Sequence, residues 1–308
     1  NAFVKKFIGT RAFYASVLAM LVPMIVQQGI TQFVNLLDNV MVGALGTTPM
    51  SGVAIVNQII FIFNLTIFGG LSGASIFGAQ FYGKGDQEGL RYTLRFRLVF
   101  SLVVCALGIG VFLLFGESLF SLYLNEEASA PEEIAATLGY AKDYIAIMLF
   151  GLLPFAVNQC FSSTLRDVGE TFSPMMASVI AICVNLAGNY LLIYGSFGFP
   201  RMGVAGAALA TVIARWVEMG YLLLRTYRHR KQFPFVQGLF QNFRVPLPLV
   251  KQIAITGTPL ELADFGLASQ LGEVAGVAGE LRPPVDFWMA LAALAICVGI
   301  LVLVRRLT

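Results

Sequence analysis

A single carboxylate, Asp38, lies in the first long apolar run of the chain. No other Asp, Glu, Lys or Arg occurs between Arg11 and Lys84. An ionisable side chain at the centre of a membrane span costs about 2.5–3.5 kcal/mol on the insertion scale. A carboxylate in such a place needs a cation, a proton or a basic partner. The position of Asp38 therefore predicts a site for a mobile cation or a proton.

Neutral polar residues accompany Asp38 at helical spacing. Gln28, Thr31, Gln32, Asn35 and Asp38 fall within about 120° of one another on a helical wheel, which is a single face. Later apolar runs also carry polar side chains, and we expect these to point away from lipid toward a cavity or a bundle core. They are Asn57, Asn64, Asn158, Ser162, Asn185 and Asn189. Each neutral residue taken alone is also explained by an interhelical hydrogen bond, worth about 0.6 kcal/mol.

The elements that position these residues are predicted to be membrane helices. The chain is 57% hydrophobic and 12% charged, with a mean hydropathy of +0.79, whereas soluble domains are about 25% charged. A helical span needs about 20 apolar residues. The stretches that qualify are 12–37, 51–78, 98–116, 144–165, 171–194 and 203–224, with 287–304 as a weaker seventh candidate. Pro23 predicts a kink in the first of them.

The basic residues predict the orientation of these spans. If the N-terminus with Lys5, Lys6 and Arg11 is cytoplasmic, the cytoplasmic loops also hold basic residues, which include Arg91, Arg95 and Arg97. The outside segments then hold only Lys142 and Arg201. Such an excess of basic residues on one side marks the cytoplasmic face. We therefore predict an all-α, multi-pass protein of the plasma (inner) membrane, with both ends of a six-span unit inside.

Two more charges lie in the sixth stretch. Arg215 and Glu218 are spaced i, i+3, so we predict a local ion pair between them. The first five stretches contain no Lys or Arg, which leaves Asp38 without a basic partner. The one histidine, His229, lies in a basic run typical of a cytoplasmic loop, and the four cysteines show no metal spacing. We find no hydrolase, phosphate-loop or metal-pair motif, and predict neither an enzyme, nor a cofactor beyond a coupling ion, nor a nucleic-acid partner.

Five short segments form an ordered set along the chain. They are 37–43 (LDNVMVG), 78–83 (GAQFYG), 165–171 (LRDVGET), 185–189 (NLAGN) and 198–211, which contains GFP and GVAGAALAT. In this order and spacing they resemble the multidrug and toxic compound extrusion (MATE) transporters over roughly residues 12–260. The resemblance implies a six-helix N-terminal lobe of an antiporter that exports drugs or organic cations by alternating access, coupled to Na⁺ or H⁺.

The resemblance also implies roles for individual residues. Asp38 matches the coupling-ion carboxylate of the first helix, Asn185 an amide ligand of the fifth, and Thr211 a hydroxyl of the sixth. Many members carry a second carboxylate where this chain has Asn189, which we predict to be the fourth residue of the cation-binding group. The loss of one negative charge should weaken a Na⁺ site at Asp38 and Asn185, since hard cations favour charged oxygens. A partly desolvated Asp38 alone could still take up a proton, so both coupling ions stay open.

The resemblance ends near residue 260. We predict a six-helix lobe over 1–235, a cytoplasmic linker with the start of a seventh helix over 236–260, and an irregular tail over 261–308 that holds the candidate span 287–304. Because the chain is much shorter than family members, we expect a truncated or frameshifted product that needs a dimer or a C-terminal lobe. The expected partners are an organic cation and membrane lipids. The alternatives are a lipid-linked precursor flippase, which favours basic residues in its cavity, and a non-functional membrane remnant or scaffold.

Overall fold

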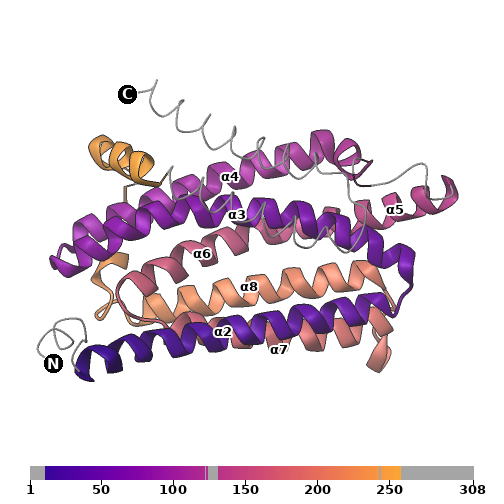
Figure 1. The fold of residues 1–308 in the computed structure, drawn as a ribbon, viewed down its shortest axis with the longest axis horizontal. Coiled ribbons are helices and arrows are strands. Elements are labelled where there is room, and N and C mark those ends of the chain that lie inside the picture. Colours follow the sequence, from indigo (N-terminus) through magenta and orange to yellow (C-terminus); the bar gives the residue numbers. More distant parts are fainter. Residues whose placement is uncertain (1–10, 122, 124–130, 243, 258–308) are drawn as a thin grey trace, which may run out of the picture.

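The structure is a computed structural model that describes residues 11–121, 123, 131–242 and 244–257. These residues form an up-and-down bundle of long helices, and no strand occurs among them. The tail 261–308, with the candidate span 287–304, lies outside the described residues. Figure 1 shows that the start of α2 and the segment that follows α8 lie at the same end of the bundle, as an even number of crossings requires.

Six helical segments of the described chain are long and apolar enough to cross a membrane. The helices that form them are α2 (Arg11–Gly43), α3 (Thr47–Gly83), α4 (Gln87–Ser121), α5 (Pro131–Met148), α6 (Leu152–Asp167), α7 (Phe172–Tyr194) and α8 (Val204–Arg228). Helices α5 and α6 form one span, interrupted by the 3-10 turn η1 (Leu149–Gly151). Pro154 follows this turn in the first turn of α6, where its missing N–H costs little.

Helix α4 begins much earlier than the predicted stretch at residue 98. Asp86 caps it, because its carboxylate accepts hydrogen bonds from the backbone N–H groups of Glu88 (3.1 Å) and Gly89 (2.9 Å). Arg97 therefore lies inside the helix, and its side chain is fully buried. The prediction that placed it in a cytoplasmic loop was wrong.

The helices form two layers around a continuous apolar core. Figure 1 shows α2, α7 and α8 together along one side of the bundle, with α7 largely behind α2, and α3, α4, α5 and α6 above them. Small residues let α7 and α8 approach closely. A Cβ placed on Gly188 would lie 2.9 Å from the Cβ of Ala210, and one on Gly206 would lie 2.6 Å from the carbonyl oxygen of Leu192. This contact fixes the relative position of the two helices that carry most of the candidate site.

The segment after α8 packs back onto the lobe. It contains the 3-10 turn η3 (Pro234–Val236), and Phe235 is 2% exposed. Arg91 donates to the carbonyl oxygen of Phe235 (3.2 Å), and Arg95 donates to those of Leu239 (3.0 Å) and Gly238 (2.7 Å). The two arginines of α4, predicted only as topology signals, thus hold this linker in place.

Helix α2 is the least covered of the spans. In its most apolar window 6% of the residues are buried, against 33–56% in the other five. Among its described side chains only Val34 and Val42 are buried. The helix runs without interruption through Pro23, although the proline removes the hydrogen bond to the carbonyl of Ala19. Helix α2 is therefore attached to the lobe mainly through a few polar contacts.

Candidate functional site

Asp38 lies at the interface of α2 with α7. Its Oδ1 accepts a hydrogen bond from Nδ2 of Asn189 at 2.6 Å, and that amide nitrogen also lies 3.2 Å from Oδ1 of Asn185. Asn185 and Asn189 are buried, and both sit on one face of α7 because they are spaced i, i+4. The side chain of Asp38 is partly exposed. Three of the four residues predicted for cation binding are thus brought together.

Thr211 of α8 completes this group. Its hydroxyl donates to the carbonyl of Ala207 (3.0 Å) and lies 3.1 Å from the amide of Asn185. The close packing of α7 on α8 brings Thr211 within reach. The candidate site therefore draws one side chain from α2, two from α7 and one from α8.

The nitrogen and oxygen of the Asn185 amide can be placed in two orientations, and each gives Asp38 different hydrogen-bond partners. With its nitrogen toward Asp38, Asn185 donates to both carboxylate oxygens, at 3.0 and 3.1 Å, and its oxygen accepts from Thr211, whose hydroxyl then no longer donates to the carbonyl of Ala207. With its oxygen toward Asp38, three oxygen atoms converge, and Asn185 donates to Thr211 instead. The Asn189 amide donates to Oδ1 of Asp38 and to Oδ1 of Asn185 in this orientation, and a shared proton or cation would stabilise the three oxygens further.

The remaining polar residues that were predicted to line a cavity differ in how far the structure buries them. Asn158 is 2% exposed, and Asn64 is partly buried. Asn57 is exposed, although its Oδ1 accepts a hydrogen bond from Tyr144 (3.3 Å). On α2, Thr31 faces the bundle and donates to the carbonyl of its own helix at Gln27 (2.9 Å).

Gln28 and Asn35 are not covered by other described helices, and the Asn35 amide donates to Gln32 at 3.2 Å. The buried face of α2 is thus centred on Gln27, Val34 and Asp38, at one edge of the predicted polar stripe.

Two residues near the site were not predicted. Tyr144 of α5 is 5% exposed and interacts electrostatically with both Asp38 and Arg215. Gln27, the neighbour of the predicted Gln28, donates from Nε2 to Oγ of Ser178 at 2.7 Å. A helical wheel could have suggested Gln27, since it lies about 20° from Asp38 at 100° per residue.

The charged residues of the lobe pair differently from the prediction. Arg215 and Glu218 do not form an ion pair within 4.0 Å. Arg215 instead donates to the carbonyl of Gly151 (3.3 Å) and lies 5.1 Å from the ring centroid of Phe155. The bundle interior offers these contacts, which override the helical i, i+3 spacing. Arg215 also makes no ion pair with Asp38.

A buried ion pair occurs elsewhere in the lobe. Nη2 of Arg97 lies 2.5 Å from Oδ2 of Asp167, with side-chain exposures of 0% and 7%. Arg97 also donates to Thr164 (2.6 Å) and Ser75 (2.9 Å). The expectation that the first five spans lack basic residues was therefore wrong, but the charge of Arg97 is neutralised locally.

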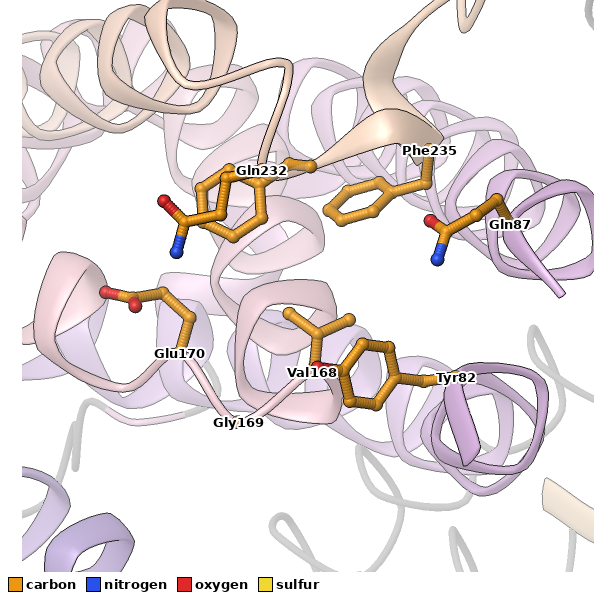
Figure 2. A pocket seen from close by; sticks show the side chains of 8 residues that line it. Tyr82, Gln87, Val168, Gly169, Glu170, Gln232 and Phe235 are labelled. Atoms are coloured by element: carbon orange, nitrogen blue, oxygen red, sulfur yellow. The ribbon is translucent and has the colours of Figure 1, made fainter. Parts of the chain in front are cut away.

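A pocket of about 120 Å³ lies at the end of the bundle opposite Asp38. Figure 2 shows Glu170 pointing toward Gln232, with Tyr82, Gln87 and Phe235 around the same space. Oε1 of Glu170 accepts hydrogen bonds from the backbone N–H (2.9 Å) and the hydroxyl (2.7 Å) of Ser173, so it caps α7. The pocket shares no residue with the Asp38 site. No group of three His, Cys, Asp or Glu suited to a metal ion occurs in the described part of the chain.

The fold and the site define a multi-pass helical membrane protein with a buried polar cluster around one carboxylate. The chain belongs to the MatE family, whose profile matches residues 23–191. It is similar to a probable multidrug resistance protein NorM of Thermotoga maritima, with 31% identity over 202 residues, 66% of this chain and 42% of that protein. It is also similar to the multidrug resistance protein MdtK of Pectobacterium atrosepticum, with 27% identity over 80% of this chain and 52% of that protein.

Solved structures show the same fold. A crystal structure of MATE in complex with MaD3S has a TM-score of 0.70 at 21% identity and covers 92% of this chain and 66% of that one. A crystal structure of MATE in the bent conformation has a TM-score of 0.68 at 21% identity, over 92% and 63% of the two chains. The predicted fold class and family are confirmed. The chain spans about half the length of the curated relatives it matches.

Proposed function

We propose that this lobe is the cation-binding part of a transporter that exports drugs or organic cations, and that Asp38 binds the coupling ion. The observation that carries the proposal is the group of polar side chains that three helices bring together, with Asn185, Asn189 and Thr211 around the Asp38 carboxylate. A proton or cation on Asp38 favours the orientation in which the Asn185 oxygen faces it. Release of the ion favours the orientation in which the nitrogen donates.

The site would hold Na⁺ through oxygens of Asp38, Asn185 and Thr211, and would hold H⁺ on Asp38 itself. Asn189 supplies an amide where a second carboxylate would add negative charge. The donor set fits either ion, because one carboxylate and neutral oxygens form a weak site for a hard cation and a sufficient one for a proton. Occupancy would change the hydrogen bond that ties α2 to α7 and so shift the position of α2.

The orientation and the partners are also part of the proposal. The positive-inside pattern supports a cytoplasmic N-terminus in the plasma (inner) membrane. The uncovered polar residues of α2 support a substrate cavity on that side, closed by a second copy or by a C-terminal lobe. A lipid-linked precursor flippase receives less support, because Asp167 neutralises the buried Arg97.

Ion binding by the purified 308-residue protein tests the proposal directly. Na⁺ titration by calorimetry at fixed pH, with proton release recorded in parallel, should show binding of Na⁺ or titration of one proton that Asp38→Asn abolishes. Glu117→Gln, which neutralises an exposed carboxylate of α4 outside the cluster, should keep it. Organic-cation accumulation in cells should rise with Asp38→Asn and stay unchanged with Glu117→Gln. Wild-type protein that binds neither ion, or an Asp38→Asn protein that binds both normally, would overturn the proposal.

A further inference from the structure

A second carboxylate of the lobe is connected to α2 by a chain of hydrogen bonds. Nε2 of Gln27 donates to Oγ of Ser178 (2.7 Å), and that hydroxyl donates to Oε1 of Glu218 (2.8 Å). These two hydrogen bonds link α2, α7 and α8. Glu218 follows Thr211 by seven residues on α8, so it lies about 10 Å further along the helix than the Asp38 cluster. It is thus a separate site.

The charges that surround Glu218 come from several helices. Arg215 lies on the same helix, and Arg166 lies on α6; both interact with Glu218 electrostatically. Neither forms an ion pair with it within 4.0 Å. Tyr144 of α5 faces Arg215, while α2 and α7 contribute only the neutral Gln27 and Ser178. The carboxylate is therefore held by hydrogen bonds within the membrane part of the bundle.

Asn158 supplies an unused hydrogen-bond acceptor beside this carboxylate. Its side chain is 2% exposed and interacts with Glu218. Its Oδ1 is buried and has no hydrogen-bond partner within the described chain. A buried carbonyl oxygen without a donor is costly, by about 1–3 kcal/mol. A carboxyl O–H on Glu218 is a donor that would satisfy it once the Asn158 amide turns over.

We propose that Glu218 is a second proton-binding site and that its protonation releases the Gln27 segment of α2. In the ionised state, Ser178 and the Asn158 nitrogen donate to the carboxylate, and the charge strengthens the whole chain back to Gln27. A proton taken up from water forms an O–H bond on Glu218, which then donates to Oδ1 of Asn158. The Ser178 bond loses its charge assistance, and the attachment of Gln27 weakens with it.

A proton fits this place better than a metal ion or an organic cation. The two guanidinium groups near Glu218 oppose any added positive charge, a proton included, so size is the property that separates these ligands. Protonation adds no atom larger than hydrogen to a packed helix interface. The inference extends beyond the proposed function, because it assigns a second ion-responsive contact to α2 that is independent of Asp38.

Infrared difference spectroscopy tests the protonation step. With the Asp38→Asn protein in lipid, acidification should produce the carbonyl band of a protonated carboxyl that is missing from Asp38→Asn/Glu218→Gln. The matched control is Asp38→Asn/Glu117→Gln, since Glu117 is exposed on α4; it should lack only a band of an ordinary solvated carboxyl. Identical spectra for the Glu218→Gln variant and its parent would overturn the proposal, whatever Asp38 binds.

A distance measurement tests the release of α2. Spin labels on Cys183, exposed on α7, and on a cysteine placed at the exposed Ile25 of α2 report their separation, with Cys297 replaced by serine. In the Asp38→Asn background the distribution should broaden or lengthen on acidification, and Glu218→Gln should show the acidic distribution at every pH. Ser178→Ala should keep the infrared band but lose the distance response. A distance response that persists in Glu218→Gln would refute the link.

Discussion

Neutralising Asp167 should destabilise the lobe strongly, because it leaves a guanidinium buried without its counter-ion. Arg97 and Asp167 have side-chain exposures of 0% and 7%. Removing one partner of a buried ion pair typically costs about 3–5 kcal/mol. In Asp167→Asn, Arg97 keeps its hydrogen bonds to Thr164 and Ser75. The amide oxygen of the new asparagine can still accept a hydrogen bond from Arg97. We therefore expect the lower end of the range, about 3 kcal/mol.

The assay is reversible unfolding of the 308-residue protein in mixed detergent micelles. The control is Glu117→Gln, which breaks the exposed pair of Glu117 with Lys142, whose side chains are 79% and 48% exposed. An exposed pair contributes about 0–1 kcal/mol and weakens with salt. The effect of Asp167→Asn should be several times larger and insensitive to salt.

The double variant Arg97→Met/Asp167→Leu separates the charge from the packing. It removes both ions together, so it should cost less than the sum of the two single changes. A cost below about 1 kcal/mol for Asp167→Asn, or one equal to that of Glu117→Gln, would refute the reasoning. Either result would mean that water reaches Arg97 and screens its charge.

Three further changes test other contacts. Gly78→Ala should cost about 1–3 kcal/mol in the same unfolding assay, because the added Cβ would collide with the buried carboxylate of Asp167. Gly83→Ala on the same helix has open space around its Cβ and should be near neutral. Arg95→Ala should raise hydrogen exchange across 234–240 because two carbonyls lose their donor, while Lys84→Ala should not. Asn189→Asp should increase Na⁺ affinity in calorimetry by adding a charged oxygen, and an unchanged or lower affinity would contradict a cation site there.

The sequence predicts the outline of this fold well, because membrane spans leave a strong signal. Each of the six predicted stretches coincides with one helical span of the structure, although 144–165 crosses the turn η1, and 171–194 and 203–224 begin one residue before α7 and α8. Their ends were misplaced because the helices extend beyond the hydrocarbon layer. Helix α4, with 35 residues, is about 52 Å long, whereas the layer is about 30 Å thick. A hydropathy pattern detects only the part of a helix that lies inside the hydrocarbon layer. Arg97 was therefore assigned to a loop, although it lies within α4 in the bundle.

Part of the candidate site could be predicted, because isolated polar residues in apolar helices also leave a signal in the sequence. Asp38 was visible as an isolated charge, and Asn185 and Asn189 were visible through their i, i+4 spacing. A helical wheel gives relative directions but not which direction faces the partner helix. Gln28 was therefore chosen over Gln27, which lies 100° away and makes the contact. Contacts between distant segments, such as Ser178 with Glu218, have no local signal in the sequence.

The attachment of α2 explains why two ionisable groups matter for one helix. Apolar burial contributes little to the attachment of α2 to the other helices, since only Val34 and Val42 are buried among its described side chains. Two of its polar contacts are at Gln27 and Asp38, eleven residues or about 16 Å apart on the helix. Each of these two contacts ends on or contains a carboxylate, so the proposed protonation or cation binding would change its strength while leaving the apolar core of the other helices intact. A helix held in this way would respond to ions where a helix held by packing would not.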